Sequence, residues 1–331
     1  MKIRMKATKN KICIFLVTYN RKKYLKYALE SVLNQSYGDF TLTILDNCST
    51  DGTKEYVESI LDQRIKYIRH EKNIGGLANI AYAFEHSEGE YFAVFHDDDI
   101  LHSTLIEEEI TYLEDHDECV AVSCLSNNID ENGNLINLIN ESKNKERKFT
   151  GNEFFTEYLN HQRSFTFPAT MYRTSFIKNN FINIRSEPGP CFDVVLYMDI
   201  GKCGGTIVEI PKVLFDFRIT KTQMSTTYLE DMLVKLIHYL SCNDYYRTLL
   251  MADHTGRTRF FKWYFRRLLA RIISNCVNYG DAVKYLELIF YELDRPVENI
   301  KRYKKILKFS ADYSGLSMLA YKTIKKVKYR I

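Results

Sequence analysis

The chain has 331 residues with a net charge of +4, and its 45% hydrophobic and 14% aromatic content is enough to bury a large core and too apolar for a disordered chain. Its eight cysteines form no CxxC pair, which argues against a zinc site or disulfide framework and favours a reducing, cytoplasmic setting. No apolar run reaches about 18 residues and no signal peptide is recognisable, so neither a membrane-spanning helix nor secretion is expected.

Strands and helices are expected to alternate through the first hundred residues. Strands are expected at residues 12–17, 40–45, 64–69 and 91–95. The first and last are apolar runs typical of buried strands, and the second alternates between apolar and polar residues. Helical spacing of apolar residues follows three of them, at 24–33, at about 53–61 and in a stretch that runs through Ala83. The sequence therefore predicts an α/β fold with a doubly wound, mostly parallel sheet, whose ligands bind outside the carboxyl ends of the strands.

Three consecutive aspartates, Asp97, Asp98 and Asp99, follow the strand at 91–95 directly. Adjacent carboxylates at the end of a buried strand repel one another, and a cation between them removes that cost. Short acidic side chains supply the oxygen ligands that Mn²⁺ or Mg²⁺ prefers. A solvated acidic turn that caps the next helix is the simpler alternative, but it accounts for one or two aspartates rather than three.

Polar residues also end the other predicted strands of this half. Tyr19 can stack on a base, Asp46 or Asn47 can hydrogen-bond its edge, and the glycines at 75–76 allow the backbone to approach a diphosphate. Each has an ordinary alternative: Tyr19 covers the sheet edge, Asp46 forms an Asx-turn, and the glycines only begin a helix. Their shared position at strand ends favours a nucleotide site.

No GxGxxG or GxxxxGK[ST] motif is present, which argues against an NAD domain or a P-loop.

Four motifs over residues 16–101 together resemble the front half of family 2 glycosyltransferases with the GT-A fold: LVTYNR at 16–21, LDNCSTDGT at 45–53, NIGG at 73–76 and FHDDDIL at 95–101. The resemblance implies an inverting transfer of a sugar from a UDP- or dTDP-linked donor to a hydroxyl of a glycan or lipid-linked glycan, in surface polysaccharide or glycoconjugate assembly. It puts Asp99 and Asp97 on the metal, with Asp99 as the more direct ligand. It puts the following residues around the donor: Thr18, Tyr19, Asn20, Arg21, Asp46, Asn47, Asn73, Gly75, Asp97, Asp98 and Arg218.

The resemblance also places a catalytic base at Asp193, at the start of a predicted helix. An inverting displacement needs a base beside the acceptor hydroxyl, and a carboxylate within hydrogen-bond reach is adequate. Asp199 is the rival, and a purely structural N-cap role for Asp193 is the alternative. The chain departs from the family pattern in two places: Phe192 replaces a common glutamate, and Thr220 replaces a histidine.

The second half of the chain is expected to close the sheet and then become helical. Residues 206–210 and 213–219 are expected to form two paired strands. A GT-A catalytic domain is predicted over residues 8–225, followed by a helical, basic region over 226–331. Residues 251–331 carry 18 Lys and Arg against 7 Asp and Glu.

Basic helices are expected within that region at 260–273, 301–308 and 322–330. Such helices suit an anionic membrane surface, which leaves open a peripheral position on the inner face of the cytoplasmic membrane; the alternative is a solvated basic face. No nucleic-acid module accompanies the charge. Two other functions stay open from the sequence: a non-catalytic scaffold that binds a nucleotide sugar, and a metal-dependent nucleotidyl- or phosphotransferase.

Overall fold

The computed structural model describes residues 11–220, 229–274, 276–293 and 300–312 of the chain. These residues form two compact units. The first takes in residues 11–154, 164–186 and 192–220, and the second takes in residues 155–163, 187–191 and those described beyond 228. Two short segments that lie within the predicted catalytic domain, 155–163 and 187–191, thus belong to the second unit.

The first unit begins with four parallel strands in the order β3-β2-β1-β4. Thr18 pairs with Asp46 and Val17 pairs with His96, so the carboxyl ends of β1, β2 and β4 lie level at one edge. This arrangement confirms the α/β fold with a parallel sheet that the sequence predicted. The four strands are β1 (Ile12–Thr18), β2 (Phe40–Asp46), β3 (Ile65–Arg69) and β4 (Tyr91–His96).

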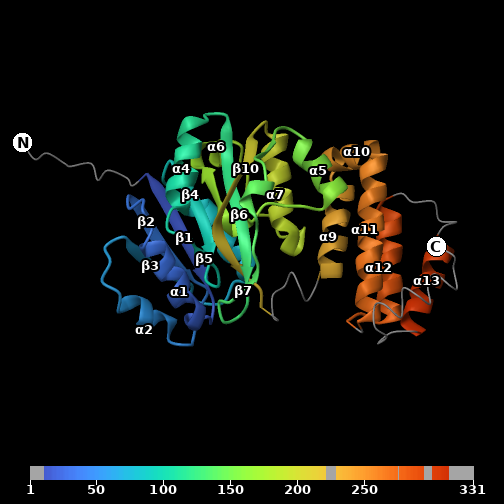
Figure 1. The fold of residues 1–331 in the computed structure, drawn as a ribbon, viewed down its shortest axis with the longest axis horizontal. Helices are drawn as coiled ribbons and strands as arrows, with labels where there is room; N and C mark the ends of the chain where they lie inside the picture. Colours follow the sequence, from blue (N-terminus) through green and yellow to red (C-terminus); the bar gives the residue numbers. More distant parts are fainter. Residues whose placement is uncertain (1–10, 221–228, 275, 294–299, 313–331) are drawn as a thin grey trace, which may run out of the picture. The chain divides into compact units, whose positions relative to one another are not determined.

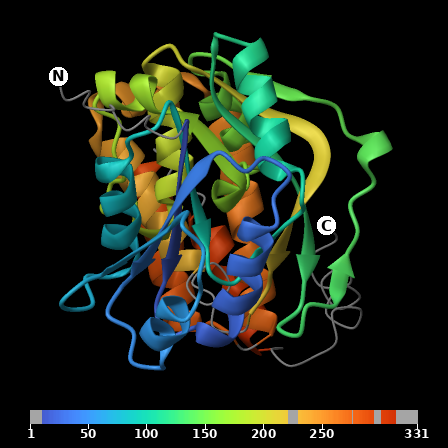
Figure 2. The same cartoon turned by 90° about the vertical axis from the view of Figure 1, so that its left-hand side faces the viewer.

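Helices cover both faces of this sheet (Figure 2). On one face α1, α2 and α4 share a hydrophobic core with alternate strand residues such as Ile14 and Phe95. On the other face α3 brings Phe84 edge-on to Phe92 of β4, with ring centroids 4.9 Å apart. The helices are α1 (Lys22–Leu33), α2 (Thr53–Glu58), α3 (Gly76–His86) and α4 (Leu105–Asp115), so α2 is shorter than expected.

Beyond β4 the sheet becomes mixed (Figure 1). Strand β9 runs antiparallel to both β4 and β6, and β10 runs parallel to β6. The short strands β5, β7 and β8 each pair antiparallel with β10 or β6. The elements are β5 (Ile100–Leu101), β6 (Cys119–Ile129), β7 (Leu135–Asn137), β8 (Arg147–Phe149), α5 (Glu153–His161), β9 (Thr170–Arg173), α6 (Thr174–Asn179), α7 (Phe192–Lys202) and β10 (Thr206–Arg218).

The prediction of two paired strands at the end of this unit was wrong. Residues 206–218 form one strand, β10, which follows β6 along its whole length. Its register shifts between Ile210 and Val213, around Pro211. Proline has no backbone N–H to donate, so it is accommodated at an irregularity of the ladder instead of ending the strand.

The second unit is helical, and α11 and α12 lie side by side in it (Figure 1). Tyr303 of α13 packs edge-on against Phe261 and Phe265 of α11 and Phe290 of α12. Its helices are α9 (Leu229–Cys242), α10 (Asp244–Ala252), α11 (His254–Ile273), α12 (Tyr279–Glu292) and α13 (Ile300–Asp312). The basic helix predicted at 322–330 lies outside the described residues. None of the helices in the described ranges is both long and apolar enough to cross a membrane.

Candidate functional site

The three aspartates after β4 are buried at the carboxyl edge of the parallel strands. Asp97, Asp98 and Asp99 are 4%, 5% and 1% exposed. Thr18, the last residue of β1, donates its hydroxyl to Oδ2 of Asp97 over 2.7 Å, and the backbone N–H of Tyr19 donates to the same oxygen over 3.4 Å. The adjoining strand end therefore fixes the orientation of Asp97. Burial and the charge of Asp98 raise the pKa of Asp97 to about 7.

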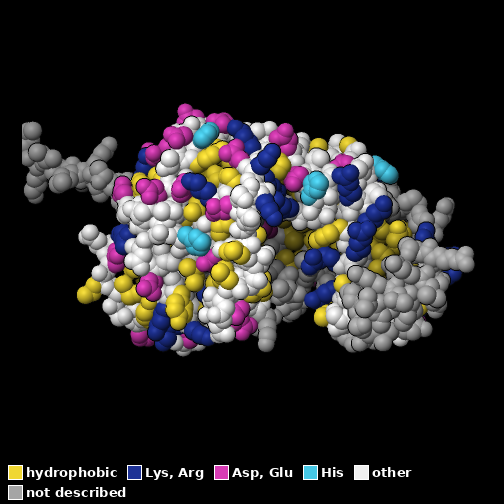
Figure 3. All heavy atoms as spheres, viewed as in Figure 1, with side chains coloured by type: hydrophobic (Ala, Val, Ile, Leu, Met, Phe, Trp, Pro, Cys, Tyr) yellow, Lys and Arg dark blue, Asp and Glu magenta, His cyan; other side chains and the backbone are white. Residues whose placement is uncertain are grey.

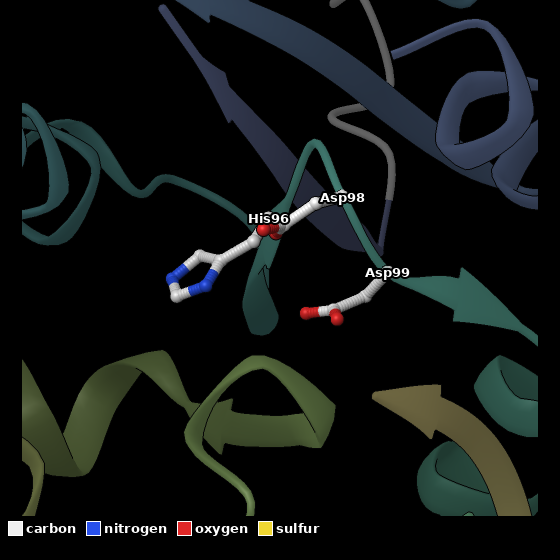
Figure 4. A group of neighbouring side chains, drawn as sticks. All are labelled: His96, Asp98 and Asp99. Carbon is white, nitrogen blue, oxygen red and sulfur yellow. The ribbon is translucent and has the colours of Figure 1, made fainter. Parts of the chain in front are cut away.

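A set of atoms able to hold a metal lies beside Asp97. One ligand atom from each of His96, Asp98 and Asp99 lies within 4.8 Å of the others. His96 is the last residue of β4, and Asp98 and Asp99 lie on the turn that follows it (Figure 4). Two of their atoms, Nε2 of His96 and Oδ2 of Asp99, are buried without a hydrogen-bond partner in the described part of the chain. Buried polar atoms normally have a partner, so these two point to one that the protein itself does not supply.

The ionisation of these groups also fits a divalent cation. Burial lowers the pKa of His96, which keeps the imidazole neutral with a lone pair available. Burial, and then the charge of Asp98, raise the pKa of Asp99 well above its usual value. A bound cation would lower the pKa of Asp99 again, because it stabilises the ionised carboxylate. A set of carboxylate and imidazole ligands suits Mn²⁺. The structure groups Asp98 with Asp99, whereas the sequence had paired Asp97 with Asp99. It also adds His96, whose sequence signal was its position directly before the aspartates.

Two arginines contact the aspartates in different ways. The Nη1 atom of Arg21 lies 2.7 Å from Oδ2 of Asp98 and 3.5 Å from Oδ1 of Asp97. Arg218, only 3% exposed, donates its backbone N–H to Oδ1 of Asp99 over 2.9 Å. Its guanidinium donates to the carbonyl oxygens of Asp98 and Asp130 over 2.6 and 2.8 Å. Arg218 therefore fixes the acidic turn by its own backbone N–H and by bonds from its guanidinium to backbone carbonyl oxygens.

The polar residues at the end of β2 are bonded to β3 and to the loop that begins at Asn73. Asp46 is fully buried and accepts hydrogen bonds from the N–H of Ser49 and the hydroxyl of Tyr67. Asn47 donates to Oδ1 of Asn73 over 2.9 Å and accepts from the N–H of Ile74 over 2.8 Å. The sequence predicts that one of these two side chains hydrogen-bonds a base. The structure shows their contacts within the protein, with Asn47 holding the loop from Asn73 to Gly75.

The remaining predicted donor residues lie on this same edge. Tyr19 is 42% exposed. Asn20 has a positive φ of 50°, donates its N–H to Oγ of Ser49 over 2.9 Å and accepts from the N–H of Thr50 over 2.7 Å, so it joins the loop after β1 to the loop after β2. Gly75 has a φ of 89°, a conformation that glycine adopts without strain.

The predicted base lies in the first turn of α7. Burial raises the pKa of Asp193 to about 6. The preceding residue, Phe192, packs edge-on against Phe167 with ring centroids 4.9 Å apart, and Phe167 in turn contacts the ring of His96 at 5.9 Å. The rival, Asp199, is 3.0 Å from the guanidinium of Arg185. Two phenylalanines, Phe192 and Phe167, therefore connect Asp193 to His96 beside the acidic turn. Asp199 has an ion pair of its own.

Comparison with known proteins agrees with this geometry. The model of the family described as glycosyl transferase family 2 matches residues 13–181, just over half of the chain. An uncharacterized glycosyltransferase of Methanocaldococcus jannaschii is 29% identical over 171 residues, which are 50% of this chain and 57% of the relative. TuaG of Bacillus subtilis, whose name assigns it to teichuronic acid biosynthesis, is 29% identical over 104 residues, 31% of this chain and 41% of TuaG. The chain thus covers less than two thirds of the length of these relatives.

Two solved structures share the fold over most of the chain. S. aureus TarS 1–349 in complex with UDP-GlcNAc gives a TM-score of 0.62 at 18% identity and covers 90% of both chains. The mannosyltransferase PcManGT from Pyrobaculum calidifontis, in complex with GDP-Man and Mn²⁺, gives 0.56 at 13% identity and covers 94% of this chain and 89% of the other. These likenesses confirm the predicted GT-A-type α/β fold. The family match over residues 13–181 shows that this chain belongs to glycosyl transferase family 2.

Proposed function

We propose that this protein is a glycosyltransferase that moves one sugar from a nucleoside-diphosphate sugar to an acceptor hydroxyl. The observation that carries the proposal is the buried turn Asp97–Asp99 at the carboxyl edge of β1, β2 and β4, where ligands of parallel sheets bind. Family membership, and neighbours solved with UDP-GlcNAc and with GDP-Man, support this reading. Relatives named for teichuronic acid and colanic acid biosynthesis support a place in surface polysaccharide assembly on the cytoplasmic side.

The donor site that we propose lies within the predicted catalytic domain, residues 8–225. The base and ribose of a UDP- or dTDP-linked sugar would lie against Tyr19 and the loop from Asn73 to Gly75, which Asn47 holds in place. The diphosphate would lie toward Arg21 and the aspartates. Asp99, with Asp98 and His96, would hold a divalent ion, Mn²⁺ or Mg²⁺, and Asp97 would support this group from its bond to Thr18. When bound, that ion would neutralise charge on the diphosphate.

Inversion requires the acceptor to attack from the face opposite the diphosphate, and Asp193 is our candidate for the base. The acceptor oxygen would bond to the anomeric carbon as the bond from that carbon to the diphosphate breaks, and Asp193 would take the hydroxyl proton. A carboxylate whose pKa is raised to about 6 holds a proton better than an ordinary aspartate and is still ionised at pH 7 and above. Its link to His96 through Phe192 and Phe167 supports a position beside the donor.

The test is calorimetric titration of the purified protein with UDP, dTDP and GDP, each with and without Mn²⁺. We expect one nucleotide to bind tightly only with the ion, and the variant Asp99→Asn to lose that dependence. Asp62→Asn is the matched control, because Asp62 pairs with Arg64 and contacts none of the site residues in the described chain. A wild-type protein that binds no nucleotide in a metal-dependent manner would refute the proposal.

We also propose that the basic helical region, residues 226–331, binds an anionic membrane surface, where a lipid-linked acceptor would be found. Helix α11 contains no acidic residue, and its exposed side chains include Arg259, Lys262, Arg266 and Arg267. The guanidinium of Arg267 lies over the ring of Trp263 at 5.2 Å, and Figure 3 shows Lys and Arg gathered over this part of the second unit. Cations beside an amphipathic aromatic ring are typical of helices that lie at an anionic interface.

Vesicle sedimentation at low salt tests this second proposal. The protein should sediment with vesicles that contain phosphatidylglycerol and stay in solution with vesicles of phosphatidylcholine alone. The double variant R266E/R267E should lose most of the binding, because each basic residue near such a surface contributes about 1 kcal/mol. Equal binding to both kinds of vesicle, or none to either, would contradict the proposal.

A further inference from the structure

Arg21 and a divalent ion would compete for the same carboxylate. The guanidinium of Arg21 lies 2.7 Å from Oδ2 of Asp98, and within the described residues no other side chain forms a hydrogen bond or an ion pair with the carboxylate of Asp98. The same carboxylate belongs to the group with His96 and Asp99 that could hold a metal. An ion and a guanidinium at one oxygen repel each other, so strong binding of the ion requires Arg21 to move or its charge to be offset.

Arg21 is placed so that it can move, and Arg218 is not. The side chain of Arg21 is 36% exposed, and its polar contacts in the described structure are with the carboxylates of Asp97 and Asp98. Arg218 is 3% exposed and is anchored to the carbonyl oxygens of Asp98 and Asp130. Release of Arg21 frees a side chain that already reaches the solvent, whereas release of Arg218 would open the buried turn.

We propose that Arg21 serves as the internal counter-cation of the acidic turn, and that a donor diphosphate draws it away from Asp98 so that the divalent ion binds tightly only together with the nucleotide. This inference rests on the proposed function, because it assigns Arg21 a role at the same donor site. A diphosphate is a better partner for a guanidinium than one carboxylate, since its several oxygens accept hydrogen bonds from both arms of the fork. The divalent ion then replaces the guanidinium of Arg21 as the cation beside the aspartates.

The proposal predicts a definite thermodynamic pattern. In the wild type, Mn²⁺ alone should bind weakly and the nucleotide should strengthen that binding greatly. By linkage, Mn²⁺ should then strengthen the binding of the nucleotide by the same factor. Replacing Arg21 by an uncharged residue should strengthen the binding of Mn²⁺ alone and weaken the binding of the nucleotide without metal. The coupling between the two ligands should shrink in that variant.

The experiment is titration of MnCl₂ followed by the electron paramagnetic resonance signal of free Mn²⁺, without nucleotide and with UDP or dTDP. Arg21→Met should bind Mn²⁺ alone at least about tenfold more tightly than the wild type, as expected when one positive charge a few ångströms away is removed. Arg21→Lys keeps the charge and should stay within about threefold of the wild type. Arg64→Met is the matched control, because Arg64 pairs with Asp62 away from the aspartates, and it should not change the affinity.

Other results of these titrations would contradict the inference about Arg21. Unchanged or weaker binding of Mn²⁺ by Arg21→Met would overturn the inference while leaving the proposed function intact if the wild type still binds Mn²⁺ together with a nucleotide. If no protein binds Mn²⁺ under any condition, both the inference and the proposed metal site fail. Should Arg21→Met unfold in metal-free buffer, recovery of the wild-type melting temperature by MnCl₂ would support the inference, and no recovery would overturn it.

Discussion

Replacement of Glu109 by methionine should stabilise the protein. Glu109 lies on the buried side of α4, its side chain is 0% exposed, and neither of its oxygens has a hydrogen-bond partner in the described part of the chain. Burial raises the pKa of this carboxyl well above its usual 4.5. An orphaned buried polar group destabilises a protein by about 1–3 kcal/mol, and methionine fills a similar volume without a polar atom.

The pH dependence makes this prediction sharper. Between pH 4.5 and the raised pKa, the unfolded chain loses the proton of Glu109 while the folded chain keeps it. The wild type therefore loses stability as the pH rises through this window, by up to about 1.4 kcal/mol per pH unit, and Glu109→Met removes that slope. The gain should accordingly be small at pH 5 and larger at pH 8.

Urea unfolding followed by far-UV circular dichroism at pH 5, 6, 7 and 8 measures the effect. Glu108→Met is the matched control, because Glu108 is the neighbour on the same helix and pairs with Lys212 at the surface. It should shift the free energy of unfolding by less than about 0.5 kcal/mol at every pH. A loss of stability in Glu109→Met, or a gain that does not grow with pH, would show that the carboxyl is ionised and has a partner in the folded protein.

Three further predictions concern the site and its support. Asp193→Asn should lower the transfer rate by about 10²–10⁴-fold, and the wild-type rate measured from pH 5 to 8 should fall below about pH 6, where Asp193 with its raised pKa takes up a proton; a flat profile would exclude it as the base. Asn47→Ala should speed amide hydrogen exchange in residues 73–75 and weaken nucleotide binding, because Ile74 loses its acceptor; unchanged exchange would contradict the role of Asn47. Gly201→Ala should destabilise the first unit by about 1–3 kcal/mol in thermal or urea unfolding, since a Cβ there would lie 2.0 Å from the carbonyl oxygen of Gly151, whereas Gly38→Ala, with open space, should be tolerated.

The sequence was a good guide where a single local pattern determines the structure. The apolar runs of β1, β2 and β4 are long enough to identify buried strands, and the polar residues that end them lie level because parallel strands share one edge. Helical spacing of apolar residues likewise identified α1. Pro211 is typical of a strand end because it has no N–H to donate, and only the pairing of β10 with β6 shows that the strand continues past it.

The side-chain partners could not be read from the sequence. Asp46 and Asn47 have the chemistry to bind a base, but their hydrogen bonds to Tyr67 and Asn73 depend on loops that meet only in the folded chain. Glu109 follows Glu107 and Glu108 in an acidic stretch typical of an exposed helix, yet the rotation of α4 buries it. Whether Asp97 or Asp98 joins Asp99 likewise depends on the hydroxyl of Thr18, which lies 79 residues away along the chain.

The position of Phe167 bears on how this enzyme family could be recombined. Its ring contacts His96 at the acidic turn and Phe192 beside Asp193, although these residues lie far apart in the sequence. A chimera that exchanges residues 12–101 for those of a relative would place a foreign turn against the native Phe167 and so disturb its contact with Phe192, beside Asp193. We therefore expect a chimera to keep the donor preference of its source only when the segment around residue 167 is exchanged together with the first hundred residues.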